Sequence, residues 1–321
     1  MSVEERQTPA VSLPTPALLA GSGVLILLSA VLPWLWVAAA PLAGAVVARA
    51  RLAGTRKQAR LWSGLLLLWL PLCLWDVQLL WGLGLGVAST LLLTALFRRG
   101  YDRLNTSLAL QLVILLATVG AFYLALAQWL ETWHPATLLD RFVRQMSVLL
   151  EQVEVRLEEV LAQQPQNLAS TQAMVANLRK SLSLMLPSLL PGAVTLSGFV
   201  AFACTGRLAA GAPQWAYPLP NRYTGLLLLS LLAGMLPLGT GAELAASAVA
   251  SFAGTVLLCE GLHWLFIKIN AMEAPAALAF MLKGAAVLVA LVLNLYAVLG
   301  AACLCLYRGM KAVLPPPDGS K

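Results

Sequence analysis

The stretch 141–164, RFVRQMSVLLEQVEVRLEEVLAQQ, decides the fold because it is polar and helical between two strongly apolar parts of the chain. Its apolar residues step by three or four positions, which is typical of one face of an α-helix. They are Phe142, Met146, Leu149, Val153, Leu157 and Val160. After Pro165 and Asn167, a second stripe runs through Met174, Val175, Leu178, Leu182 and Met185. We therefore predict an extramembrane helical hairpin over residues 132–186, with its two stripes packed together.

The composition on either side of this insert indicates a membrane protein. The 321 residues are 60% hydrophobic and 11% charged, and the mean hydropathy is +0.82. A soluble domain needs more charge at its surface. The prediction is an all-α, polytopic transmembrane helix bundle of about eight to ten spans. The expected regions are 1–131 (N-terminal membrane half), 132–186 (insert), 187–311 (C-terminal membrane half) and 312–321 (tail).

The expected spans are the apolar runs, each bounded by charged, proline or glycine residues. They cover 17–32, 34–48, 61–75, 79–97, 107–130, 186–206, 223–238, 244–267 and 275–307. The last run, about 33 residues long, exceeds the roughly 20 that one span needs. A break near Gly284 or Asn294 would give ten crossings, whereas one long tilted helix would give nine and place the C-terminus outside.

Basic residues gather at the ends of apolar runs. The two clusters are Arg49, Arg51, Arg56, Lys57 and Arg60, and then Arg98, Arg99 and Arg103. Such residues orient transmembrane helices with their basic loops in the cytoplasm. We therefore expect a cytoplasmic N-terminus and an external insert. The same distribution argues against nucleic-acid binding as the reason for the net charge of +7.

Few residues suggest a metal site, a cofactor site or a catalytic site. All five cysteines lie in apolar runs without a CxxC pair, and the chain has only two histidines, so we expect no metal site and no cofactor. No Walker A, GxSxG or HExxH sequence is present. We therefore expect that the protein is not an enzyme.

Span 244–267 carries the most informative residues. Ala246, Ala250 and Gly254 repeat every fourth position, which favours close helix packing. Glu260 and His263 are three residues apart and so share a helix face. An ionisable residue inside a span normally faces the bundle interior or a water-filled cavity.

Lys283 is the expected partner of Glu260. If 268–275 is the turn of an antiparallel pair, Glu260 lies eight residues before it and Lys283 eight residues after its last residue. The two side chains would then reach similar depth. We predict a buried ion pair with His263 beside it, acting either as a clamp between two helices or as a substrate or proton site.

The order of features resembles the YybS-like family of predicted bacterial multi-pass membrane proteins, a domain of unknown function. The resemblance covers roughly residues 15–310. It rests on the N-terminal spans with basic loops, the polar insert, MLPSLLPG (185–192), YPLP (217–220) and GLHWLFIK (261–268). It implies a place in the bacterial cytoplasmic membrane. It also implies a distant similarity to the substrate-binding components of energy-coupling-factor transporters.

Two functions are the main expectations. The first is a transporter-like or substrate-binding membrane component that uses a cavity near Glu260, His263 and Lys283. The second is a non-catalytic scaffold that recruits another membrane or envelope protein through the insert. An intramembrane enzyme is the weakest alternative. The expected partner is the lipid bilayer, and the sequence does not identify a small-molecule substrate.

Overall fold

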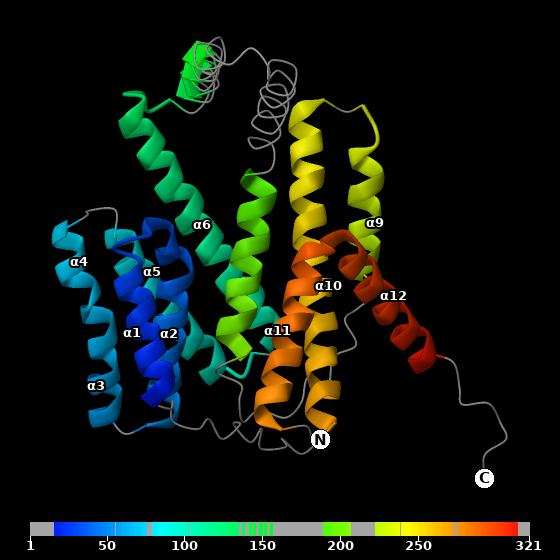
Figure 1. Cartoon of the computed structure of the whole chain (residues 1–321), viewed down its shortest axis with the longest axis horizontal. Coiled ribbons are helices and arrows are strands. Elements are labelled where there is room, and N and C mark those ends of the chain that lie inside the picture. The colour runs from blue at the N-terminus through cyan, green and yellow to red at the C-terminus, as the bar shows by residue number, and fades with distance from the viewer. Residues whose placement is uncertain are drawn as a thin grey trace, which may run out of the picture. The chain divides into compact units, whose positions relative to one another are not determined.

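The chain folds as an all-α helical bundle (Figure 1). The computed structural model describes residues 16–54, 56–75, 79–101, 103–134, 189–206, 222–237, 239–272 and 275–313, together with 137–138, 141–142, 144–145, 148–149, 151–152 and 155–156. No strand occurs in these parts of the chain. Contacts divide the chain into two compact units, 1–115 with 191–321, and 116–190.

The helices of the first membrane half follow one another with short connections. They are α1 (Pro16–Leu28), the short 3-10 helix η1 (Pro33–Leu35), α2 (Trp36–Ala53), α3 (Arg56–Leu67), α4 (Trp69–Trp75), α5 (Leu80–Arg98) and α6 (Arg103–Trp129). The second half holds the helix Leu189–Gly206, α9 (Arg222–Gly234), α10 (Thr240–Ala271), α11 (Ala276–Val292) and α12 (Asn294–Val313).

Five described helices are long and apolar enough to cross a membrane. They are Trp36–Ala53, Leu80–Arg98, Leu104–Trp129, Leu189–Gly206 and Gly241–Ala271. Shorter apolar helices accompany them, among them Leu19–Leu28, Tyr223–Gly234 and Ala277–Ala290. Helices of this length and composition indicate a membrane protein, because a lipid environment tolerates a backbone whose polar groups are all satisfied within the helix.

The helix ends agree with most of the expected spans. The predicted pair 17–32 and 34–48 forms α1 and α2, separated by the turn at Pro33. The long apolar run after residue 275 is broken at Leu293, between α11 and α12, so the predicted break near Asn294 is confirmed. The expected span 61–75 is helical but interrupted, since α3 ends at Leu67 and α4 begins at Trp69. Pro71 explains the interruption, because it cannot donate a hydrogen bond to the Leu67 carbonyl.

Helices α2 and α5 pack closely through small residues. A Cβ on Gly44 would lie 2.7 Å from the Gly86 carbonyl oxygen and 2.9 Å from the Ser89 Cβ. The two backbones can approach this closely only because small residues meet at the crossing. The Thr90 Oγ1 then donates to the carbonyls of Gly86 at 2.8 Å and Gly44 at 3.2 Å, which ties the two helices together.

A buried polar seam joins α6 to the helix Leu189–Gly206. The hydroxyls of Ser107 and Thr205 are 2.7 Å apart and both residues are fully buried. One turn along, the Gln111 Nε2 donates to the Val194 carbonyl at 2.9 Å. These bonds fix the rotation of one apolar helix against another, which apolar contacts alone leave poorly defined.

We expect Ser107 and Thr205 to be energetically coupled by about 0.6 kcal/mol, and at most about 1.7 kcal/mol, as measured for such pairs in membrane proteins. The measurement is a double-mutant cycle of Ser107→Ala and Thr205→Ala, using reversible unfolding in mixed micelles. A coupling indistinguishable from zero would show that the Ser107–Thr205 contact does not stabilise the seam.

Both basic clusters lie at the same end of the helices in the unit formed by 1–115 and 191–321 (Figure 1). One stands where α2 ends and α3 begins, and the other where α5 ends and α6 begins. Lys57, Arg60, Arg98 and Arg99 are exposed. Arg49 is instead 7% exposed, while the Arg51 Nη2 donates to the Ser63 Oγ at 3.3 Å. Arg56 and Arg103 are the first residues of α3 and α6, and their side chains lie outside the described set.

Residues 116–190 form the second unit. At the end of α6, the Thr132 amide donates to the Ala127 carbonyl and the Glu131 amide to the Gln128 carbonyl, while Glu131 has φ 51°. This is a Schellman C-cap, in which the left-handed position is usually glycine. The described positions between 137 and 156 are helical, as predicted for the first arm of the insert. The second arm lies outside the described residues, so the hairpin stays a prediction.

Candidate functional site

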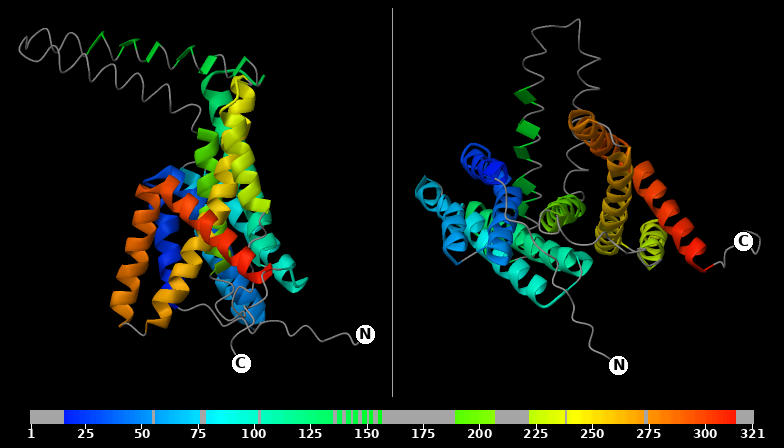
Figure 2. Two further views of the ribbon diagram at one scale, coloured as in Figure 1. Left: turned by 90° about the vertical axis from the view of Figure 1, so that its right-hand side faces the viewer. Right: turned by 90° about the horizontal axis from the view of Figure 1, so that it is seen from below.

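A cavity of about 210 Å³ lies among four helices of the C-terminal half. Its walls come from the helix Leu189–Gly206, α9, α10 and α12, and Figures 1 and 2 show α12 crossing α10 obliquely. The lining residues are Thr195, Leu227, Leu231, Ser247, Ala250, Ser251, Gly254, Thr255, Leu258, Val298 and Leu299. We call this space the hydroxyl cavity, because its polar lining side chains are all serine or threonine.

The hydroxyl groups of the cavity are not equivalent. The Thr195 Oγ1 donates to the Pro191 carbonyl at 3.0 Å, and the Thr255 Oγ1 donates to the Ser251 carbonyl at 2.6 Å. Each hydroxyl hydrogen is therefore engaged within its own helix, and the oxygen is left with acceptor lone pairs. A ligand in this cavity would meet apolar walls and acceptor oxygens, which together suit an amphipathic molecule with a hydrogen-bond donor.

The predicted small-residue ridge borders this cavity. Ala250 and Gly254 line it, while Ala246 is half-buried one turn earlier on α10. Gly254 also packs on α12, since a Cβ there would lie 3.4 Å from the Val298 Cγ1. The tighter approach to α12 is at Gly261, where a Cβ would lie 2.9 Å from the Ala301 Cβ. Gly254 thus packs against α12, Ala250 and Gly254 border the cavity, and close packing along the whole ridge stays a prediction.

Glu260 and His263 lie on α10 below the cavity, on a different face of that helix. Both belong to one continuous helix and so share a face as predicted. Glu260 is 3% exposed, and His263 is half-buried. At roughly 100° per residue, Glu260 points nearly opposite to the cavity-lining positions 251, 254, 255 and 258. Neither residue lines the hydroxyl cavity.

The structure moves the turn on which the pairing of Glu260 with Lys283 depends. Helix α10 continues to Ala271, eleven residues beyond Glu260, whereas α11 begins at Ala276, seven residues before Lys283. The difference of four residues is about one helical turn, or roughly 6 Å along the axis. The two residues therefore stand at different distances from the turn, and the ion pair of Glu260 with Lys283, with His263 beside it, stays a prediction. Lys283 is half-buried on α11.

Sequence reasoning missed the hydroxyl residues of the cavity. Ser247, Ser251 and Thr255 follow one another at intervals of four on α10, and this spacing places them on one helix face. The signal was present in the sequence. The spacing alone does not indicate a cavity, because serine and threonine in a transmembrane helix commonly donate a hydrogen bond to their own backbone, as Thr255 does here.

No protein-family model, curated protein or solved structure matches this chain. The resemblance to the YybS-like family stays a prediction.

Proposed function

We propose that this protein is a membrane component that binds a small amphipathic molecule in the hydroxyl cavity, in the manner of a transporter's substrate-binding subunit. The observation that carries the proposal is the cavity itself, which combines apolar walls with serine and threonine hydroxyls inside an apolar helix bundle. Ligand sites typically pair mostly apolar lining with a few placed polar groups.

The chemistry of the walls supports a ligand with a donor group. Thr195 and Thr255 come from two different helices, and each keeps an acceptor oxygen after bonding to its own backbone. A ligand hydroxyl or amine could donate to either oxygen, while Leu227, Leu231 and Leu258 would cover its apolar part. The volume of about 210 Å³ limits the buried part of the ligand to a small molecule or a short chain.

Glu260 and His263 stand outside this proposed site. Their place on another face of α10 makes direct contact with a ligand in the cavity geometrically unfavourable. A buried carboxylate in an apolar helix still calls for an explanation. The helix-clamp role and the substrate-site or proton-site role expected from the sequence are both predictions for Glu260.

Filling the cavity is expected to abolish ligand retention. Ala250→Leu adds three carbon atoms to a lining position, and a small cavity cannot hold both the added side chain and a ligand. The matched control is Ala245→Leu, which makes the same change at an exposed position of α10. The measurement is mass spectrometry of small molecules that copurify with each protein after exhaustive detergent washing.

We expect a compound that is retained by the original protein and by Ala245→Leu, and reduced at least tenfold in Ala250→Leu, which corresponds to about 1.4 kcal/mol. Equal retention by both variants would place the ligand elsewhere and refute the proposed site. Circular dichroism and gel filtration of Ala250→Leu show whether the fold is intact.

A further inference from the structure

A second polar cavity lies at the end of α6, within the unit 116–190. Its volume is about 360 Å³, and it is lined by Trp129, Leu130, Glu131, Arg141, Arg144 and Gln145. We call it the arginine pocket. It shares no residue with the hydroxyl cavity, and none of the functions argued so far uses it.

The arginine pocket is held together by specific contacts. The Arg141 Nη1 donates to the Leu130 carbonyl at 3.0 Å, so this arginine is fixed across the C-terminus of α6. The rings of Trp129 and Phe142 meet edge to face with centroids 6.5 Å apart. Next to them, the Tyr123 hydroxyl donates to the Trp133 carbonyl. These contacts orient the first helical turns of the insert against the end of α6 and thereby set the geometry of the pocket.

The position of the pocket along α6 points to the membrane surface. The apolar segment Leu104–Trp129 has 26 residues, or roughly 39 Å of helix, which exceeds the roughly 30 Å hydrocarbon core. Trp129 and Trp133 are 52% and 61% exposed. Tryptophan is enriched at the level of lipid headgroups, which favours that level for the pocket that begins at Trp129.

The charges of the pocket favour an anion. Arg141 and Arg144 bring two positive charges to the lining and Glu131 brings one negative charge, so basic side chains outnumber acidic ones among the lining residues. Guanidinium groups bind phosphate through paired hydrogen bonds. Arg141 uses one of its five N–H groups on the Leu130 carbonyl and retains the others for a ligand.

We propose that the arginine pocket binds the phosphate of an anionic phospholipid headgroup. The two arginines hold the phosphodiester, and the indole of Trp129 lies at the boundary between headgroup and acyl chains. The same phosphate chemistry could be supplied by free inorganic phosphate. The location at the headgroup level favours the lipid, because the pocket is next to a continuous supply of it.

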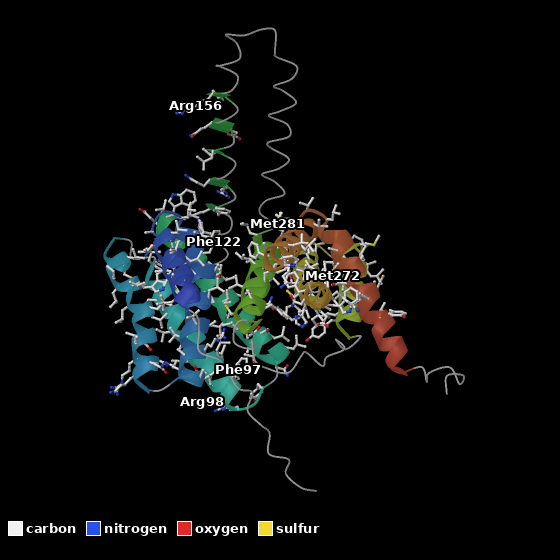
Figure 3. All side chains as sticks on the ribbon, turned by 60° about the horizontal axis from the view of Figure 1, so that its bottom comes forward. Phe97, Arg98, Phe122, Arg156, Met272 and Met281 are labelled. Carbon is white, nitrogen blue, oxygen red and sulfur yellow. The ribbon has the colours of Figure 1, made fainter. Side chains whose placement is uncertain are left out.

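The test is native mass spectrometry of the full-length protein in detergent, with either phosphatidylglycerol or phosphatidylcholine carrying the same acyl chains. We expect the original protein to retain phosphatidylglycerol preferentially. The double substitution Arg141→Gln and Arg144→Gln should lower the lipid-bound fraction about fivefold or more, since two charge-assisted donors are lost. The control is Arg156→Gln, an exposed helical position later in the insert and outside the pocket (Figure 3), which should retain the lipid.

Three results would overturn the proposal. They are equal retention of phosphatidylcholine, unchanged retention by the double variant, and displacement of the lipid by millimolar inorganic phosphate. If the double variant does not fold, Glu131→Gln decides the question. This change keeps the side-chain size and raises the charge of the pocket by one, so retention of phosphatidylglycerol should increase about twofold or more. Unchanged or lower retention in a folded Glu131→Gln protein would also refute the proposal.

Discussion

Replacing Gly44 with valine is expected to destabilise the N-terminal half by about 3 kcal/mol or more, because overpacking a tight contact commonly costs 1–3 kcal/mol. The first added atom alone would lie 2.7 Å from the Gly86 carbonyl oxygen. A backbone atom cannot move aside as a flexible side chain can, so α2 and α5 must separate. Separation also breaks the bond from the Thr90 Oγ1 to the Gly44 carbonyl.

The loss is measured as the midpoint of thermal unfolding of the purified protein in detergent, followed by the yield of monodisperse protein. The matched control is Gly84→Val, a helical glycine of α5 around which a Cβ meets nothing within 4 Å. We expect Gly84→Val to stay close to the original midpoint. If the two variants unfold alike, the close approach of α2 and α5 at Gly44 does not occur.

Replacing Gly198 with valine is expected to disrupt the junction of three helices and the hydroxyl cavity beside it. A Cβ at this position would lie 2.6 Å from the Thr255 Cγ2 and 2.9 Å from the Gln111 Nε2. Thr255 lines the cavity, and Gln111 is 3% exposed and bonded to the Val194 carbonyl. Either Thr255 on α10 or Gln111 on α6 must therefore move to make room for the valine side chain.

We expect Gly198→Val to lose about 2–3 kcal/mol of stability and, in addition, to lose the compound retained by the original protein. The control is Gly192→Val on the same helix, where a Cβ meets nothing within 4 Å. Unfolding in mixed micelles gives the first quantity, and mass spectrometry of the copurifying compound gives the second. Full stability of Gly198→Val would contradict the close crossing of these helices.

Helix existence was largely predictable from the sequence, and the exceptions have local reasons. The turn at Pro33 followed from two short apolar runs on either side of a proline, and the break at Leu293 followed from an apolar run too long for one span. The division of 61–75 into α3 and α4 was missed, although Pro71 was visible. The end of α10 was placed at Lys268, but the helix continues to Ala271, because a lysine is a good helix former and does not stop a helix.

The candidate site was less predictable. The sequence predicted a site at Glu260 because a carboxylate is costly inside an apolar helix. The cavity, however, depends on the face of α10 that carries Ser251, Gly254 and Thr255. The sequence shows this face as serine and threonine residues spaced four positions apart, but it does not show which neighbouring helices leave a cavity beside it. That depends on Gly198, Val298 and the oblique crossing of α12.

The amino-acid sequence alone was enough to predict a bundle of apolar helices with basic residues grouped at the helix ends. A lipid environment leaves the backbone no partner outside the helix, so length and apolarity are enough to specify each helix. The rotation of each helix about its axis could be read only from the packed fold. Lipid tails are as apolar as the side chains of a neighbouring helix, so hydrophobicity does not select the buried face. Close packing at glycines and a few hydroxyl bonds select it, and they turn the serine and threonine face of α10 toward the cavity and Glu260 away from it.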